Sequence, residues 1–300
     1  MSKKIQIILF STLFLIILLL LSKFYFFNNS SQNKITYYQV SDLKIPSNLS
    51  FCGEKVPLQD SDVLERLDRE LHVNTYWHSN SILTMKRANR WLPKIEEILI
   101  EKNIPIDFKY LPIIESNLTN AISPAGATGF WQFMKATAKE SGLTVNEEID
   151  ERYNPIKSTY AACIYLKNAH KRLGSWTNVA ASYNMGIAGV SRRLKSQGVS
   201  SYYDLLLNTE TARYVFRILA IKHILENKVE YGFDISEEGL YEQAKLRNIK
   251  VLESIKDLAF FAKKHNSNYK LLKRHNPWLR KNKLTLKKGQ SYTIFLPQTR

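Results

Sequence analysis

The sequence is poor in cysteine and in acidic residues. Cys52 and Cys163 are the only cysteines, so at most one disulfide bridge can form within the chain. Cys163 lies in the helical pattern TYAACIYLKNA, which favours a small buried thiol over a bridge. Asp and Glu number 27 against 43 Lys and Arg, which gives a net charge of +16 and indicates an anionic partner such as nucleic acid, lipid or cell-wall polymer.

Two other features are missing, and both absences narrow the chemistry. The sequence motifs include no cluster of His, Cys and carboxylate residues at metal-ligand spacing and no glycine-rich phosphate loop. We therefore expect a function that needs no metal, nucleotide or other cofactor.

The first residues have the composition of a membrane segment. Lys3 and Lys4 precede an uncharged apolar run from Ile5 to Leu21, which is just long enough to cross a bilayer as a helix. The next residues, SKFYFF, are typical of an aromatic interfacial border and not of a small-x-small cleavage site. The pattern favours an uncleaved anchor (residues 1–27) over a cleaved signal peptide. It places the remaining chain outside the cytoplasmic membrane, in the periplasm or cell envelope, which disfavours nucleic acid as a partner.

The rest of the chain divides into three regions. Residues 28–59 are rich in Ser, Asn and Pro and predict a tether whose end packs on the following domain. Residues 60–232 have helical periodicity and no sustained alternation, which predicts an all-α domain of several short helices. Residues 245–300 predict a separate module with a strand, two short helices and a final strand.

Local signals predict two helix starts in the all-α region. Asn154-Pro155 combines an N-cap with a proline at the first helical position, and this helix is expected to end near Gly174. Thr177 is expected to cap the next helix.

One carboxylate lies in an otherwise apolar and turn-forming stretch, YLPIIESNLTNAISPAGATGFWQFM. If Pro105 opens a helix, Glu115 shares its inward face with Phe108 and Leu111, and Pro112 should break the helix just before the glutamate. Desolvation by aromatic neighbours would keep Glu115 protonated near neutral pH, so that it could donate a proton. A glutamate that is paired with a lysine, or that caps a helix, is the structural alternative.

Glu115 belongs to the first of four motifs that follow one another along the chain. They are ES at Glu115, SPAGATGFWQ from Ser123 to Gln132, ASYNMG from Ala181, and ETARYV from Glu210. Together they resemble the goose-lysozyme-like lytic transglycosylase (SLT) domain, specifically that of the D-type membrane-bound lytic murein transglycosylases, over roughly residues 50–232. The resemblance implies a lysozyme-like multi-helix fold and a peptidoglycan substrate.

The resemblance also implies a mechanism with one essential carboxylate. Glu115 would protonate the glycosidic oxygen between N-acetylmuramic acid and N-acetylglucosamine. It would then take a proton from the C6 hydroxyl of the muramic acid, which attacks C1 and closes a 1,6-anhydro ring. The attack is intramolecular, so proximity replaces a second carboxylate that would activate water.

Three substrate-binding residues are implied close to the glutamate. Ser116 would orient Glu115 or the neighbouring backbone, unless it only bonds locally at a helix end. Gln132 ends the Gly-x-x-Gln motif, and its amide would contact an N-acetyl group or brace the loop. Ser123 is a weaker candidate, because a serine before proline is common in turns.

The later motifs imply three more substrate-binding residues. Tyr183 and Asn184 match the Ala-Tyr-Asn motif, with Ser182 in place of the alanine. The phenol of Tyr183 would steady the carboxylate or the charge that develops at C1, unless it packs in the core. Glu210 would contact sugar or frame the site, and an ion pair with Arg213 is the alternative.

The C-terminal module resembles a LysM module, a βααβ unit that binds N-acetylglucosamine polymers. The likeness lies in SIKDLAFFAKKHNSNYKLLKRHNPWL, including the Asn276-Pro277-Trp278 end of the second helix. The alternative is a structural appendage whose basic face lies near anionic wall or lipid.

Two other functions stay open. A hydrolase of the lysozyme type would need a second acid opposite Glu115, for which Asp150 and Glu151 are candidates that fit capping and structural roles better. A non-catalytic murein-binding protein held at the membrane would be expected to have lost the acid or the Tyr-Asn pair, and both are present.

The anchor hypothesis has a direct test. If Ile5–Leu21 stays in place, the protein should remain in the membrane fraction after a high-salt wash, because salt screens surface electrostatics and not apolar insertion. Release of a soluble species that lacks the first two dozen residues would instead show a cleaved signal.

Overall fold

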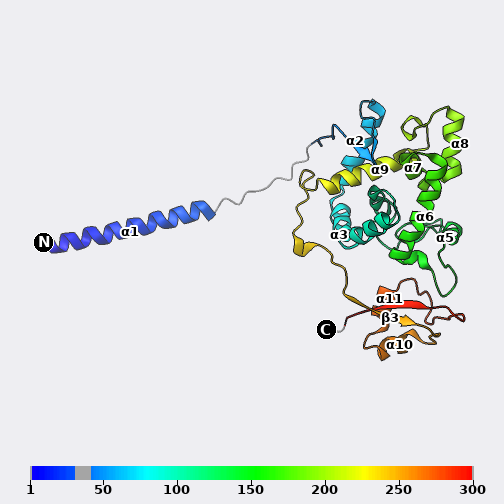
Figure 1. Ribbon diagram of the computed structural model, residues 1–300. Coiled ribbons are helices and arrows are strands. Elements are labelled where there is room, and N and C mark those ends of the chain that lie inside the picture. The colour runs from blue at the N-terminus through cyan, green and yellow to red at the C-terminus, as the bar shows by residue number, and fades with distance from the viewer. Residues whose placement is uncertain (1, 31–41, 299–300) are drawn as a thin grey trace. The chain divides into compact units, whose positions relative to one another are not determined.

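The computed structural model describes residues 2–30 and 42–298 and contains two compact units, Met1–Asp42 and Leu43–Arg300. Residues 31–41 of the expected tether lie outside the described residues. The first unit contains the helix α1 (Lys3–Ser30) (Figure 1). Its stretch Lys3–Tyr25 has a mean hydropathy of 2.7, so it is long and apolar enough to cross a membrane, although a signal sequence has the same properties.

The second unit begins with a helical domain, which we define as residues 43–240. The expected all-α architecture of residues 60–232 is confirmed, with only isolated bridges among their described residues. The elements are α2 (Ser61–Tyr76), α3 (His78–Glu101), η1 (Ile106–Tyr110), α4 (Leu111–Ser116), α5 (Lys135–Glu140), η2 (Glu151–Tyr153), α6 (Pro155–Leu173), α7 (Trp176–Met185), α8 (Ile187–Gln197), η3 (Tyr202–Asp204), α9 (Thr209–Glu226) and η4 (Glu237–Gly239).

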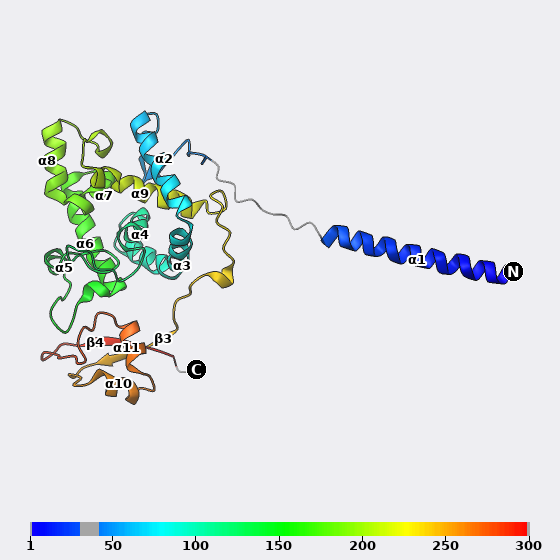
Figure 2. The ribbon, with the colours of Figure 1, turned by 180° about the vertical axis from the view of Figure 1, so that it is seen from behind.

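The short helix α4 lies in the middle of this domain. Figure 2 shows it surrounded by α3, α6 and α9, and it contacts α9 and η1. Leu111 and Ile113 of α4 are fully buried in the main core, and so are Val215 and Leu219 of α9. Burial of these apolar side chains fixes α4 within the domain.

Polar caps define the beginnings of the longer helices, and one predicted cap was wrong. Asn154 accepts hydrogen bonds from the first-turn amides of α6, which ends at Gly174, as predicted. Helix α7 begins two residues earlier than expected, because Ser175 is its N-cap and Thr177 lies in its first turn. The amide and hydroxyl of Thr177 both donate to Glu54, a residue far away in the sequence.

Glu54 belongs to a small antiparallel hairpin that precedes the helices, formed by β1 (Ser50–Phe51) and β2 (Glu54–Lys55). Phe51 and Val56 are buried in the core of the helical domain, so the end of the expected tether packs on the domain. The carboxylate of Glu54 also accepts from Trp176 N at 2.6 Å and from Ser175 Oγ at 2.8 Å. The hairpin therefore holds the N-terminus of α7.

The C-terminal module (residues 245–300) has the expected βααβ order. It consists of β3 (Leu246–Val251), α10 (Leu258–Lys264), α11 (Tyr269–His275) and β4 (Tyr292–Pro297), and the two strands pair antiparallel from Leu246↔Pro297 to Val251↔Tyr292. Asn276 follows α11, is fully buried, and exchanges two hydrogen bonds with the backbone of Phe295 in β4. The module has its own apolar core.

Both cysteines are free thiols in the structure, so the alternative of a Cys52–Cys163 bridge is not realised. Cys163 is buried in α6, as its pattern indicated.

Glu54 should contribute to stability in a pH-dependent way. Burial would raise its pKa, but the hydrogen bonds from Thr177, Ser175 and Trp176 outweigh burial and lower the pKa below its ordinary value of 4.5. A lowered carboxyl pKa adds stability above its unfolded-state value, and this stability is lost as the pH falls through the folded-state value. Glu54→Gln should therefore destabilise the protein by about 1–3 kcal/mol at pH 7.

This difference should shrink as the pH falls from 7 to below the lowered pKa of Glu54, where the carboxylate becomes protonated. Urea unfolding at both pH values measures it, with the exposed Glu65→Gln as the matched control, for which we expect a change within about 0.5 kcal/mol. An equal effect of the two substitutions at pH 7 would contradict the prediction.

Candidate active site

Glu115 lies in the last turn of α4. The break expected just before the glutamate lies further back, at Leu111, where the 3-10 helix η1 gives way to α4. Pro112 occupies the first turn of α4, where its missing N–H costs no helical bond, so it lies in the same helix as Glu115. The chain leaves α4 through two left-handed residues, Asn117 at φ 51° and Leu118 at φ 54°. This conformation is uncommon for leucine, and the burial of Leu118 holds it in place.

The carboxyl group of Glu115 is partly buried and accepts a hydrogen bond from a residue of α9. Tyr214, which is 2% exposed, donates its hydroxyl proton to Glu115 Oε1. Arg217, one turn further along α9, donates to Ile114 O at 2.9 Å and brings a positive charge close to the carboxylate.

Burial decides the protonation state of Glu115. Desolvation raises the pKa, the Tyr214 bond and the Arg217 charge lower it, and the charge of Glu210 raises it again, which leaves the pKa of Glu115 at about 7. The predicted desolvation of Glu115 is therefore present, and with this pKa much of its carboxyl group stays protonated near neutral pH. Burial also raises the pKa of Tyr214 well above its ordinary value, so the phenol remains a hydrogen-bond donor.

Ser116 links α4 to the loop of residues 121–133, which we call the motif loop. Its hydroxyl is buried and lies 2.9 Å from Phe130 O and 3.1 Å from Pro112 O. It therefore orients the backbone beside Glu115 and does not contact the carboxylate itself.

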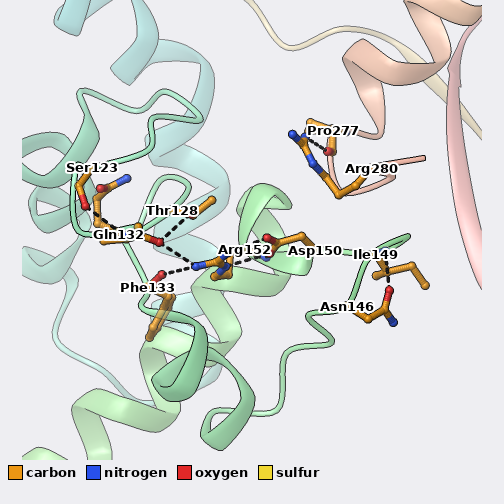
Figure 3. A network of polar contacts seen from close by, with 12 residues as sticks. Ser123, Thr128, Gln132, Phe133, Asn146, Ile149, Asp150, Arg152, Pro277 and Arg280 are labelled. Atoms are coloured by element: carbon orange, nitrogen blue, oxygen red, sulfur yellow. Dashed lines mark hydrogen bonds and ion pairs between the residues drawn. The ribbon is translucent and has the colours of Figure 1, made fainter. Parts of the chain in front are cut away.

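Gln132 braces the motif loop from within. Its Nε2 donates to Gly129 O at 2.8 Å and to Ala121 O at 3.0 Å, and the residue has a left-handed φ of 46°. Ser123 makes the turn contact that its sequence context indicated, since its Oγ accepts from Ala127 N at 3.0 Å. Figure 3 shows Ser123 and Gln132 on neighbouring parts of this loop.

Tyr183 contacts the motif loop instead of the carboxylate. Its phenol donates to Trp131 O at 2.8 Å, and its ring packs against Phe133 and Tyr165. Its charge interaction with Glu115 shows that the two groups lie near one another, while the hydrogen bond to Glu115 comes from Tyr214.

Asn184 and Glu210 are brought together at the ends of α7 and α9. Asn184 Nδ2 donates to Glu210 Oε1 at 3.1 Å, and Asn184 Oδ1 accepts from Thr211 Oγ1 at 2.7 Å. The alternative ion pair between Glu210 and Arg213 does not form, because Arg213 Nε binds the buried Glu70 of α2 at 2.6 Å. Glu210 thus remains close enough to Glu115 to raise its pKa.

Tyr214 donates the hydrogen bond to Glu115 but was not among the site residues predicted from the motifs. It lies four residues after Glu210 in ETARYV, so both share one face of α9, and this spacing is the signal that could have identified it. Asp150 and Glu151 occupy structural positions: Asp150 caps η2 and pairs with Arg152, and Glu151 pairs with Lys157.

Two family models match the chain, one over part of the helical domain and one over the C-terminal module. Residues 100–206 match the transglycosylase SLT domain, and residues 247–300 match the soluble lytic transglycosylase C-terminal LysM-like domain. The first match includes Glu115, Gln132 and Tyr183, and it ends before Glu210 and Tyr214.

Curated relatives are similar over part of the chain. Membrane-bound lytic murein transglycosylase D of Escherichia coli (strain K12) is 29% identical over 192 residues, which are 61% of this chain and 42% of the relative. The protein of the same name from E. coli O6:H1 gives the same values. A putative tributyltin chloride resistance protein of Alteromonas sp. (strain M-1) is 33% identical over 112 residues, 37% of this chain and 54% of the relative. The chain thus spans less than half the length of the E. coli relatives.

A solved structure of an inactive mutant of the lytic transglycosylase Slt from Pseudomonas aeruginosa is 18% identical. Its TM-score is 0.39, over 59% of this chain and 33% of that one.

The raised pKa of Glu115 predicts a stability effect that needs no substrate. A raised carboxyl pKa gives stability that is fully present below the unfolded-state value of 4.5 and is lost as the pH rises through about 7. Glu115→Gln keeps an acceptor for Tyr214 and has no charge to desolvate. The free energy of unfolding of the variant minus that of the native protein should therefore be larger at pH 8 than at pH 5, by about 1–3 kcal/mol.

Urea unfolding of both proteins at the two pH values measures this difference. The matched control is Glu140→Gln, because Glu140 is exposed at the end of α5. A pH-independent difference for Glu115→Gln, equal to that of the control, would contradict the assignment of the raised pKa.

Proposed function

We propose that this chain is a lytic transglycosylase that cleaves the β-1,4 bond between N-acetylmuramic acid and N-acetylglucosamine in peptidoglycan without consuming water. One observation carries the proposal: within the segment that matches the SLT domain, a single carboxyl group has a pKa of about 7 and is oriented by Tyr214. The names of the two E. coli relatives support the same activity.

In the proposed reaction, Glu115 acts first as an acid and then as a base. It protonates the glycosidic oxygen as the C1–O bond breaks, and the N-acetylglucosamine hydroxyl leaves. The ionised Glu115 then removes the proton from the C6 hydroxyl of the muramic acid, whose oxygen bonds to C1. A pKa near 7 suits both steps, because neither proton transfer is strongly uphill at neutral pH.

The surrounding groups have separate roles in this proposal. Tyr214 donates to Oε1 of Glu115, so Oε2 is the oxygen that exchanges the proton with substrate. Gln132 and Asn184 provide amides, and Ser123 and Glu210 provide a hydroxyl and a carboxylate, for contacts with the sugar. Ser116 and Tyr183 hold the motif loop through Phe130 O and Trp131 O.

Hydrolysis of the same bond is the second candidate function. Glu210 lies near enough to Glu115 to affect its pKa, so it is the acid best placed to activate a water molecule. Its bond from Asn184 Nδ2 favours a positioning role over that of a base, because a donated hydrogen bond lowers basicity.

The two flanking parts would bring the helical domain to its substrate. We propose that α1 anchors the chain in the cytoplasmic membrane, with Lys3 and Lys4 inside and the helical domain in the periplasm or cell envelope. The apolar helix and the description of the E. coli relatives as membrane-bound support anchoring. The LysM-like module would add affinity for the glycan strands.

The products distinguish the two reactions. The full-length protein in detergent should release muropeptides that end in 1,6-anhydro-muramic acid, each lighter by one water than a lysozyme product, because the C6 hydroxyl near C1 outcompetes bulk water. Glu115→Gln removes the exchangeable proton and should lower turnover by a factor of about 10⁴ or more, since acid and base steps each contribute about 10²–10⁴.

Mass spectrometry of digested murein provides the measurement, and Glu140→Gln, which should keep full activity, is the matched control. Reducing-end products would assign the protein to the hydrolases. Full activity of the Glu115→Gln variant would disprove the proposed site.

A further inference from the structure

The segment of residues 146–153, which we call the brace, connects the C-terminal module with the motif loop. On the module side, Ile149 pairs antiparallel with Leu279, Asp150 N donates to Trp278 O at 2.9 Å, and Arg280 N donates to Glu148 O at 2.7 Å. The brace thus contributes an additional short stretch of paired backbone to the module.

Side chains extend this contact into the core of the module. Ile149 and Tyr153 are buried among the apolar residues of the module, and the guanidinium of Arg280 lies 3.9 Å from the ring centroid of Tyr153. Glu148 accepts from Thr285 N at 2.8 Å and pairs with Lys283 at 3.0 Å. Because the module buries residues of the helical domain in its own core, it is docked on the brace and not merely linked to it.

On its other side, the brace holds the motif loop through one arginine. Arg152 Nη1 donates to Gly126 O at 3.1 Å and to Phe133 O at 3.0 Å, so it joins the two ends of the turn that contains Gln132. Asp150 holds Arg152 in place, with Nε bonded to Oδ1 at 3.0 Å and Nη2 to Oδ2 at 2.7 Å. Figure 3 shows Arg152 between the motif loop and Asp150.

The Asp150–Arg152 pair is well shielded, with both side chains only 10% exposed. A buried charge that loses its partner is costly, so each member depends on the other. The planar, forked guanidinium also has donors for both carbonyl groups and the carboxylate at once, which a lysine ammonium on one flexible stem cannot match.

The backbone of the brace also determines what fits in the loop. Gly129 has a φ of 85°, and a Cβ added there would lie 2.0 Å from Arg152 O. The motif loop therefore packs directly on the backbone of the brace, and a displacement of the brace would be transmitted to Gly129 and to the neighbouring Phe130, Trp131 and Gln132.

We propose that Arg152 is a positioning residue for the motif loop and that docking of the C-terminal module on the brace keeps this loop ordered for substrate binding. The inference rests on the proposed function, because the loop presents Gln132 to the glycan. The loop is also bonded to the end of α4, since Phe130 O accepts a hydrogen bond from Ser116 Oγ. The module then supports the active site in addition to any binding of glycan.

The test compares two buried ion pairs in the full-length protein in detergent. Arg152→Lys and Asp150→Asn each weaken the brace. The matched control is Asp107→Asn, because Asp107 also pairs in a buried position, with Lys222 at 2.7 Å, and also accepts a backbone bond, from Cys52 N. The native pairs are similarly shielded, and the hydrogen bonds of Asp107 and Lys222 do not involve the motif loop.

We expect both brace variants to raise KM for soluble glycan strands by about ten- to hundredfold with little change in kcat, because a loop that is no longer pre-ordered must be ordered on binding. The pH at which activity is half-maximal should not move, since Tyr214, Arg217 and Glu210 are untouched. The control should only reduce the folded fraction, which lowers apparent kcat and leaves KM unchanged. A rise in KM for the control equal to that of the brace variants would overturn the proposal.

Amide hydrogen exchange gives a second measurement that does not depend on activity. Exchange at Gly129 and Phe133, whose amides donate within the motif loop, should rise in both brace variants and not in the control. Ile149→Ala, which opens a cavity in the core of the module, should raise exchange in the module and in the loop together. Faster exchange in the module with an unchanged loop would overturn the coupling. If Glu115→Gln kept full activity, the proposed function would fail while these exchange results would still decide the role of the brace.

Discussion

The desolvation of one carboxyl group, Glu115, is the constraint on which the rest of the helical domain depends. A glutamate in water is ionised at neutral pH, and burial is the largest cause of the rise of its pKa to about 7. The domain achieves this burial by placing α4, a helix of only six residues, at its centre, where α9 provides both Tyr214 and Arg217. The phenol is a neutral donor and Arg217 bonds to the backbone, so neither offsets desolvation completely. A lysine in direct contact with Glu115 would have kept it ionised.

The position of α4 is in turn set by features that are local in sequence. Pro112 is compatible with the first turn of a helix and not with its interior, so the chain changes from η1 to α4 just before it. Asn117 and Leu118 end the helix in left-handed conformations. Between these limits the helix is too short for Glu115 to lie anywhere except in its last turn, directly before the buried Ser116 that bonds the motif loop. Helix length, and not any single contact, brings the acid next to the loop.

Features that depend on short-range signals were predictable from the sequence, and features that depend on the choice among distant partners were not. The Asn154-Pro155 start and Gly174 end of α6 were correct, because capping involves only neighbouring residues. Thr177 was wrong as the cap of α7, because Glu54 of the hairpin binds its amide and hydroxyl and Ser175 caps instead. Arg213 could have paired with Glu210 one turn away, but the buried Glu70 of α2 is the stronger partner, since it has no access to water. Tyr183 and Tyr214 both lie near Glu115, and the packing of α4 on α9 decides that Tyr214 is the one that bonds to it.

The same distinction explains why the brace could not be recognised in the sequence. Asp150 and Arg152 are two residues apart, and such a pair on a short turn is common at protein surfaces. Its significance comes from what lies against it: Trp278 O, which accepts from Asp150 N, on one side and the carbonyl groups of Gly126 and Phe133, which accept from Arg152, on the other. Covered in this way, the pair is removed from water, and its free energy depends on the presence of both partners. A module that appears in sequence as an independent appendage is thereby part of the structure that holds Gln132. The boundary between the two matched family models is a boundary of sequence similarity and not of physical interaction.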